Sequence, residues 1–223
     1  MAEPLWLSFK LAAVTSLLLL VIGIPIAWWL SESKSRWKPA FESLVSLPLV
    51  LPPTVLGFYL LLVFSPAHGI GGWLQEWVGV SFVFSFEGLV LASIIYSLPF
   101  MVQPVQAGLA NLPRELSEAS YVLGKSKWQT LIRVLLPNCK PALLTGLVLS
   151  FAHTLGEFGV VLMIGGNLPG ETRVASIAIY DQVEALNYEA AHGYSLALLL
   201  ITFVILFITY AINHRWRRRE QHD

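Results

Sequence analysis

Side chains that could perform acid–base chemistry are rare in the apolar parts of this 223-residue chain. Glu157 lies within Gly156-Glu157-Phe158-Gly159, four residues after His153, and Asp181 follows in a more polar segment. These groups could form a hydrolytic site only with a nucleophile or a metal. The sequence has neither the Gly-x-Ser-x-Gly turn of a serine hydrolase nor a His-Glu-x-x-His zinc helix. We therefore assign no catalytic residue.

A second chemical pattern, Gly124-Lys125-Ser126, looks like the end of a phosphate-binding loop. The first glycine of that loop would fall at position 119, which is alanine, and no strand precedes it. The chain is therefore not expected to bind ATP. Cys139 is the single cysteine and has no companion for a disulfide or a metal site. We predict no metal site and no cofactor on this chain.

The composition indicates an integral membrane protein. Hydrophobic residues make up 56% and charged residues 13%, against about 25% charged in soluble domains. The mean hydropathy is +0.67. A disordered chain, a nucleic-acid binder and an ordinary soluble enzyme are excluded.

Long apolar stretches place the membrane-spanning helices. Residues 11–30, 43–64, 88–110 and 193–212 carry no charge, and Glu157 alone interrupts 141–166. About 20 helical residues cross about 30 Å of hydrocarbon, and these stretches are too long for barrel strands. We predict an all-α protein with one domain, residues 1–223. Its five transmembrane helices should lie at about 8–30, 43–65, 87–109, 138–166 and 193–213.

The distribution of basic residues predicts the orientation. Only Lys10 and Arg173 lie on one side of the predicted spans, and the other side carries twelve: Lys34, Arg36, Lys38, Arg114, Lys125, Lys127, Arg133, Lys140, Arg215, Arg217, Arg218 and Arg219. Because basic loops stay in the cytoplasm, residues 111–140 and the C-terminus should be cytoplasmic and the N-terminus outside. The N-terminal Met1-Ala2-Glu3 lacks the basic segment of a signal peptide, so the first stretch is kept as a helix.

Two irregular segments interrupt the apolar stretches. Pro52-Pro53-Thr54 falls in the second, where each proline removes a backbone hydrogen bond. Gly156-Glu157-Phe158-Gly159 falls in the fourth, with Glu157 about 24 Å along a helix counted from Pro141. We predict that Pro52, Pro53, Thr54, Gly156, Glu157, Phe158 and Gly159 form a gate on a translocation pathway. Ordinary proline kinks and an interfacial glutamate paired with backbone donors are the alternatives. A short helix over 174–185 is expected at the mouth.

Residues 111–137 carry the signals of two short helices joined by a tight turn. Asn111 can cap the first helix and Gly124 suits the left-handed turn that ends it. Ser126 and Gln129 form a capping box for a second helix that runs to Leu136. On the first helix, one face carries Leu116, Ala119, Ser120 and Leu123.

Glu118-Ala119-Ser120, Gly124, Ile132 and Leu136-Pro137 resemble the EAA loop of ABC importer permeases. Ser120 departs from the alanine that is common in that family, but it is also small. The resemblance implies a type I permease core whose cytoplasmic coupling helix docks in a groove of a separate ATPase. It assigns Glu115, Leu116, Glu118, Ala119, Ser120, Leu123, Gly124 and Lys125 to the coupling loop. A purely structural amphipathic loop is the alternative.

Pro48-Leu49-Val50-Leu51-Pro52-Pro53-Thr54-Val55-Leu56-Gly57 and Leu155-Gly156-Glu157-Phe158-Gly159 resemble the molybdate permease subgroup. That resemblance implies a homodimer in the cell inner membrane, two copies of an ATPase that binds ATP and Mg²⁺, and a periplasmic or extracellular oxyanion-binding protein. Lipid would be a partner and nucleic acid would not. Molybdate is the expected substrate; sulfate, thiosulfate and tungstate are alternatives. A secondary transporter is disfavoured because neither an inverted repeat nor a midplane coupling carboxylate is visible.

Overall fold

The computed structural model describes residues 2–67, 69–79 and 81–220, and within them every regular element is a helix. The ends of the predicted domain, residues 1 and 221–223, lie outside the described residues. In chain order the helices are α1 (Ala2–Glu32), α2 (Lys38–Val50), α3 (Pro53–Phe64), α4 (Gly69–Val78), α5 (Phe86–Ala110), α6 (Arg114–Val122), α7 (Lys127–Thr130), the π-helical turn η1 (Leu131–Leu135), α8 (Leu136–Asn138), α9 (Lys140–Leu155), α10 (Gly159–Gly165), α11 (Ala175–Glu184) and α12 (Tyr188–Glu220).

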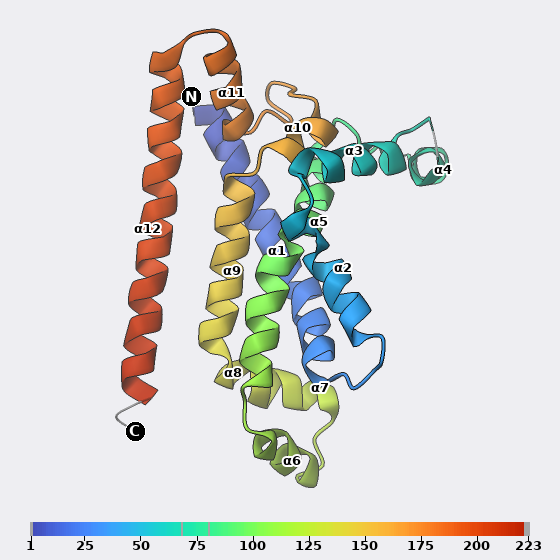
Figure 1. The fold of residues 1–223 in the computed structure, drawn as a ribbon, viewed down its shortest axis with the longest axis vertical. Helices are drawn as coiled ribbons and strands as arrows, with labels where there is room; N and C mark the ends of the chain where they lie inside the picture. The colour runs from blue at the N-terminus through green and yellow to red at the C-terminus, as the bar shows by residue number, and fades with distance from the viewer. Residues whose placement is uncertain (1, 68, 80, 221–223) are drawn as a thin grey trace.

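Helices α1, α5 and α9 form the centre of the molecule, running side by side (Figure 1). Small residues lie in their contacts because apolar bulk gives no advantage between helices in lipid, whereas close backbone approach does. The buried small residues are Ser8, Ala12, Thr15, Ser16, Gly23 and Ala27 on α1, Gly88, Ala92, Ser93 and Ser97 on α5, and Gly146, Ser150 and Thr154 on α9. This packing explains why three long apolar helices form one bundle.

Helix α12 stands at the edge of the bundle, packed against α9 and α11 (Figure 1). Asn213 Nδ2 donates to Thr145 Oγ1 of α9 at 3.2 Å. None of its most apolar segment is buried within this chain. Its apolar surface is therefore free to face lipid or another subunit.

The second predicted span, 43–65, is not one helix. Helix α2 begins at Lys38 and ends at Val50, and the chain bends by 111° between α2 and α3. Leu51 has ψ 137° and Pro52 has ψ 135° because each precedes a proline, which disfavours helical backbone. Pro48 sits inside α2, and Pro99 and Pro104 sit inside α5, without ending either helix.

The fourth predicted span, 138–166, is also interrupted. Helix α9 begins at Lys140 and ends at Leu155, and α10 begins at Gly159, so Glu157 lies in a turn rather than on a continuous helix. Toward the other end, the segment 127–138 meets α9 at 84°. The residues of the first, third and fifth predicted spans each lie within one uninterrupted helix, α1, α5 and α12 respectively.

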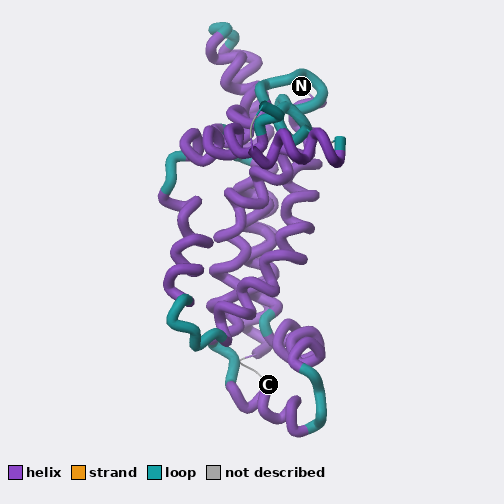
Figure 2. The backbone as a smooth tube through the Cα atoms, turned by 90° about the vertical axis from the view of Figure 1, so that its right-hand side faces the viewer, coloured by secondary structure: helices purple, strands orange, loops and turns teal. Residues whose placement is uncertain are grey.

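By length and composition, α1, α5 and residues Tyr188–Asn213 of α12 could each cross a membrane, and the two bent pairs raise the number to as many as five. The broken helices reach opposite ends of the molecule. Helices α6 to α8 form an elbow at one end, whereas α3, α4, α10 and α11 gather at the other (Figures 1 and 2). The predicted helix over 174–185 is confirmed as α11.

Candidate functional site

The elbow, defined here as residues 111–138, is built from two helices around one left-handed residue. Pro113 occupies the N-cap position of α6 and makes no side-chain capping bond. Asn111 instead ends α5, with its backbone N–H bonded to the Ala107 oxygen, so the prediction that Asn111 caps α6 is wrong. The chain needs the extended Pro113 backbone to leave α5 before it can enter a new helix.

Gly124 makes the turn, with φ +74°. The backbone N–H of Lys125 donates to the carbonyl oxygen of Ser120, and that of Gly124 donates to the carbonyl oxygen of Tyr121. These two bonds close the end of α6. The predicted capping box is present: Ser126 Oγ accepts from the Gln129 N–H at 3.2 Å and Gln129 Oε1 accepts from the Ser126 N–H at 3.1 Å. Both helix ends at the turn therefore have hydrogen-bond partners.

A buried hydroxyl pair holds the two arms of the elbow together. Ser120 Oγ and Thr130 Oγ1 are 2.9 Å apart, and the two residues are 5% and 0% exposed. The second arm was predicted as one α-helix ending at Pro137. It instead passes from α7 through the π-helical turn η1 into α8, and ends at Asn138. Such turns recur at functional bends.

The tip of the elbow is exposed and apolar. Val122 is 87% and Leu123 77% exposed. Partial burial, with the Glu32 carboxylate as a second cause, raises the pKa of the Tyr121 phenol, which stays neutral. Apolar side chains presented on a projecting turn are typical of a docking knob.

The predicted coupling residues divide into two groups. A cavity of about 450 Å³ between the arms is lined by Glu115, Leu116, Ala119, Ser120, Leu123 and Lys125. Glu118 is exposed away from this cavity, and Gly124 forms the turn. Gln129, Arg133 and Val134 complete the cavity wall. The residues predicted for the coupling loop did not include these three, which lie on the second arm of the elbow.

The two predicted gate segments are about 100 residues apart in sequence and meet in space. A Cβ atom added to Gly159 would lie 2.8 Å from Pro53 Cβ and 3.4 Å from the Thr54 nitrogen. Similarly, a Cβ added to Gly57 would lie 2.8 Å from Met163 Cβ. The contact of α3 with α10 thus requires glycine on both helices. Pro52, Pro53, Thr54 and Gly156 are exposed, and Phe158 is half-buried.

Glu157 joins three elements at the break between α9 and α10. Ser93 Oγ of α5 donates to Glu157 Oε2 at 2.7 Å, and Ser176 Oγ of α11 donates to the Glu157 carbonyl at 2.5 Å. The side chain is 4% exposed, and Oε1 has no partner among the described residues. These two hydrogen bonds fasten the turn between α9 and α10 to α5 and α11.

A second polar cluster lies deeper in the bundle, between α5 and α9. Ser97 Oγ is 2.9 Å from both His153 Nδ1 and Thr154 Oγ1. The His153 ring stacks on Phe100 at 4.1 Å and lies 4.8 Å from the Tyr96 ring. The sequence offered only a weak signal for this cluster, since Ser97 and Thr154 look like ordinary small residues in apolar helices.

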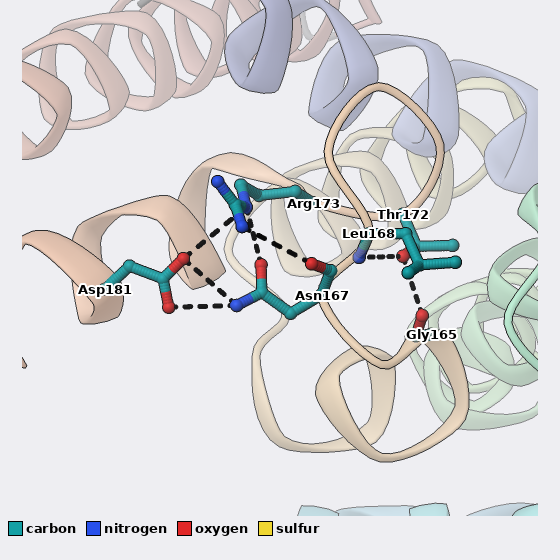
Figure 3. Close-up of polar contacts among 6 residues, drawn as sticks. All are labelled: Gly165, Asn167, Leu168, Thr172, Arg173 and Asp181. Atoms are coloured by element: carbon teal, nitrogen blue, oxygen red, sulfur yellow. Dashed lines mark hydrogen bonds and ion pairs between the residues drawn. The ribbon is translucent and has the colours of Figure 1, made fainter.

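Arg173 is paired with Asp181 at the end of the molecule where α10 and α11 lie (Figure 3). Its Nε donates to Asn167 Oδ1 at 2.6 Å and is 3.5 Å from Asp181 Oδ2 of α11, while Asn167 Nδ2 donates to both Asp181 oxygens at 3.0 Å. Thr172 Oγ1 donates to the Gly165 oxygen and accepts from the Leu168 N–H. This network fastens the loop between α10 and α11, and it balances the Arg173 charge.

The described residues hold no group of three His, Cys, Asp or Glu side chains that could bind a metal ion. The candidate site is therefore the projecting elbow, which is continuous with α5 and α9, together with the glycine-packed contact of α3 with α10 toward the other end of the molecule.

Comparison with known families identifies the class. The family model described as "Binding-protein-dependent transport system inner membrane component" matches residues 20–220, and the chain belongs to this family. It is a transport component and not an enzyme.

Individual relatives narrow the class further. The chain is 48% identical over 206 residues to "Molybdenum transport system permease protein ModB" of Azotobacter vinelandii, covering 92% of this chain and 91% of the relative. It is 34% identical to "Sulfate transport system permease protein CysT" of Escherichia coli, covering 93% and 75%. A solved structure of the MetNI methionine ABC transporter in an inward-facing conformation shares the fold, with a TM-score of 0.74 at 18% identity over 96% and 95% of the two chains.

Proposed function

We propose that this chain is the permease subunit of an ATP-driven importer that passes molybdate inward across the cytoplasmic membrane. The observation that carries the proposal is the elbow: its exposed apolar tip projects from the bundle, yet hydrogen bonds fix both of its arms. A stiff projecting turn can transmit force from a motor that the chain lacks. Similarity to molybdenum permeases over nearly the whole chain supports the substrate.

The partners follow from the same proposal. Two ATPase subunits with ATP and Mg²⁺ bind the elbows of two copies of this chain, and an oxyanion-binding protein docks at the opposite end. The elbow and C-terminus face the cytoplasm and the N-terminus faces outward, as the twelve-to-two distribution of basic residues favours.

The elbow and the gate are linked through continuous helices. Helix α5 enters the elbow at Ala110 and α9 leaves it at Lys140. The far end of α9 leads into the Glu157 turn, and α5 carries Ser93, which binds that carboxylate. When ATP binding draws the elbows together, α5 and α9 move as levers and shift the contact of α3 with α10. The passage then opens outward, and ATP hydrolysis returns it to the inward-open state.

Selectivity belongs mainly to the binding protein in this scheme. No Lys or Arg lies in the middle of a predicted span, so no fixed cation traps an oxyanion within the membrane. Weak internal binding favours conduction because the solute must also leave.

Stimulation of ATP hydrolysis tests the proposal most directly. The purified chain, with its ATPase and binding protein in vesicles, should hydrolyse ATP faster with molybdate-loaded binding protein than with the empty protein. Affinity purification of the chain should also recover an ATP-binding subunit. Absence of both results would overturn the importer assignment.

Sulfate is the second candidate, favoured by the similarity to CysT. Cells that lack the chain should lose molybdenum accumulation at nanomolar external molybdate. Normal molybdenum content together with impaired sulfate uptake would assign the chain to sulfate. Tungstate requires a direct competition assay, since it is a tetrahedral dianion of similar size.

A further inference from the structure

One face of α5 carries polar and aromatic side chains that this chain leaves partly uncovered. Tyr96, Phe100 and Gln103 follow at intervals of four and three residues and therefore share that face. Tyr96 and Phe100 are half-buried, and Gln103 is exposed although its amide donates to Ser46 of α2 at 3.0 Å. His153 of α9 joins the face through its contacts with both aromatic rings.

This face does not suit lipid. His153 lies 13 residues after the start of α9, which is about 20 Å along the helix, and Gln103 lies within α5. Polar side chains at such depth normally face a protein interior or a water-filled cavity. The face is therefore expected to meet another protein surface or a water-filled cavity rather than lipid.

The Nδ1 atom of His153 takes part in a chain of hydrogen bonds. Thr154 Oγ1, Ser97 Oγ and His153 Nδ1 form a chain with two contacts of 2.9 Å, and both hydroxyl residues are buried. If Thr154 donates to Ser97 and Ser97 to Nδ1, both hydroxyl hydrogens have acceptors. The reverse order would leave the Thr154 hydrogen without one of these acceptors. In the first arrangement the ring accepts at Nδ1 and offers an N–H at Nε2.

We propose that His153 Nε2–H is a hydrogen-bond donor to the tetrahedral oxyanion in transit, beside the Tyr96 and Phe100 rings. This inference rests on the proposed function and assigns the anion a contact within the membrane. One neutral donor per subunit holds the anion weakly enough to release it.

Substitution at position 153 tests the donor in the complete transporter reconstituted in vesicles, with labelled molybdate as the probe. His153→Phe keeps an aromatic ring and removes the donor. Because a hydrogen bond to an ion is lost, uptake should fall about tenfold or more. ATP hydrolysis stimulated by the loaded binding protein should stay within about twofold of normal, because the elbow is unchanged.

Two further variants distinguish the loss of the hydrogen-bond donor from the change in side-chain shape. His153→Gln places a neutral N–H near the position of Nε2, and it should retain uptake within about threefold of normal. His192→Phe is the matched control: His192 is exposed near the start of α12, and its substitution should leave uptake unchanged. Normal uptake by His153→Phe, or equal loss in His153→Gln and His153→Phe, would overturn the inference. An unmodified transporter that imports no oxyanion would overturn the proposed function itself.

Chemical labelling gives a second measurement that remains valid if His153→Phe fails to assemble. In a Cys139→Ala background, His153→Cys should react with a water-soluble thiosulfonate, and molybdate-loaded binding protein with ATP should change the reaction rate. Leu155→Cys is the buried control, since Leu155 is 3% exposed. A thiol at position 153 that reacts no faster than one at position 155 would show that the face is not on an aqueous pathway.

Discussion

Hydroxyl side chains make several of the polar contacts that hold separate helices of this permease together. Ser93 binds the Glu157 carboxylate, Ser97 binds His153, and Ser120 binds Thr130. Each is short enough to fit between closely packed backbones, and two of the partners, Glu157 and Thr130, are buried. Ser120, the departure from the alanine common in the EAA loop, thus has a structural explanation in Thr130.

Ser120→Ala should destabilise the elbow. It leaves the Thr130 hydroxyl buried without its partner, at a cost of about 1–3 kcal/mol. Thermal unfolding of the purified complex should occur a few degrees lower, and Ser120→Ala with Thr130→Val should recover part of the loss. Ser117→Ala is the control, because Ser117 Oγ bonds only to the Arg114 oxygen of its own helix. A double variant less stable than Ser120→Ala would contradict this account.

Glu118→Lys should uncouple transport from ATP hydrolysis without affecting insertion. Glu118 is exposed on α6 and lies outside the cavity between the arms, so its charge is free to meet a partner. Reversing that charge disfavours docking on a basic groove rim. In reconstituted vesicles, import should fall strongly while the amount of inserted protein stays normal. Import at the normal rate would remove Glu118 from the coupling surface.

At the scale of helices, two breaks in the chain determine how α3 and α10 are arranged. Consecutive prolines force α2 and α3 apart at Pro52, and the turn at Gly156–Glu157 separates α9 from α10. Helix α3 then packs on α10 through Gly57 and Gly159. In the proposed function, a small shift of either helix would open this contact.

Gly159→Ala should disturb this contact, whereas Gly156→Ala should not. A Cβ at Gly159 meets the rigid Pro53 ring at 2.8 Å, but a Cβ at Gly156 comes no closer than 3.9 Å to the nearest oxygens. Overpacking of this kind costs about 1–3 kcal/mol. The measurement compares unfolding temperatures and the basal rate of anion leakage in vesicles. Equal behaviour of the two variants would show that α3 does not pack tightly on α10.

In the whole molecule, the bundle of α1, α5 and α9 joins the elbow to the end that carries α3, α10 and α11. The elbow is covalently continuous with α5 and α9, and the gate turn is bonded to α5 through Ser93. A movement of the elbow could therefore reach the Glu157 turn through α5 and α9 if the two helices move as rigid bodies, as the proposed function requires.

Labelling from each side of the membrane checks the orientation. In a Cys139→Ala background, Ser117→Cys on α6 should react with a membrane-impermeant reagent only from the cytoplasmic side. Asn187→Cys, in the exposed turn before α12, should react only from outside. The reverse pattern would invert the proposed topology and remove the elbow from reach of a cytoplasmic ATPase.

The sequence alone determined the membrane class, the helices that cover the first, third and fifth predicted spans, the Gly124 turn and the Ser126 capping box. These depend on local composition, hydropathy and backbone preference, which a chain carries at every position. Tertiary structure decided where the second and fourth spans break, that Pro53 meets Gly159, and that Ser120 and His153 have the partners they do. Those features depend on which distant helices approach one another, and that approach is set by packing across the whole bundle, which no local pattern records.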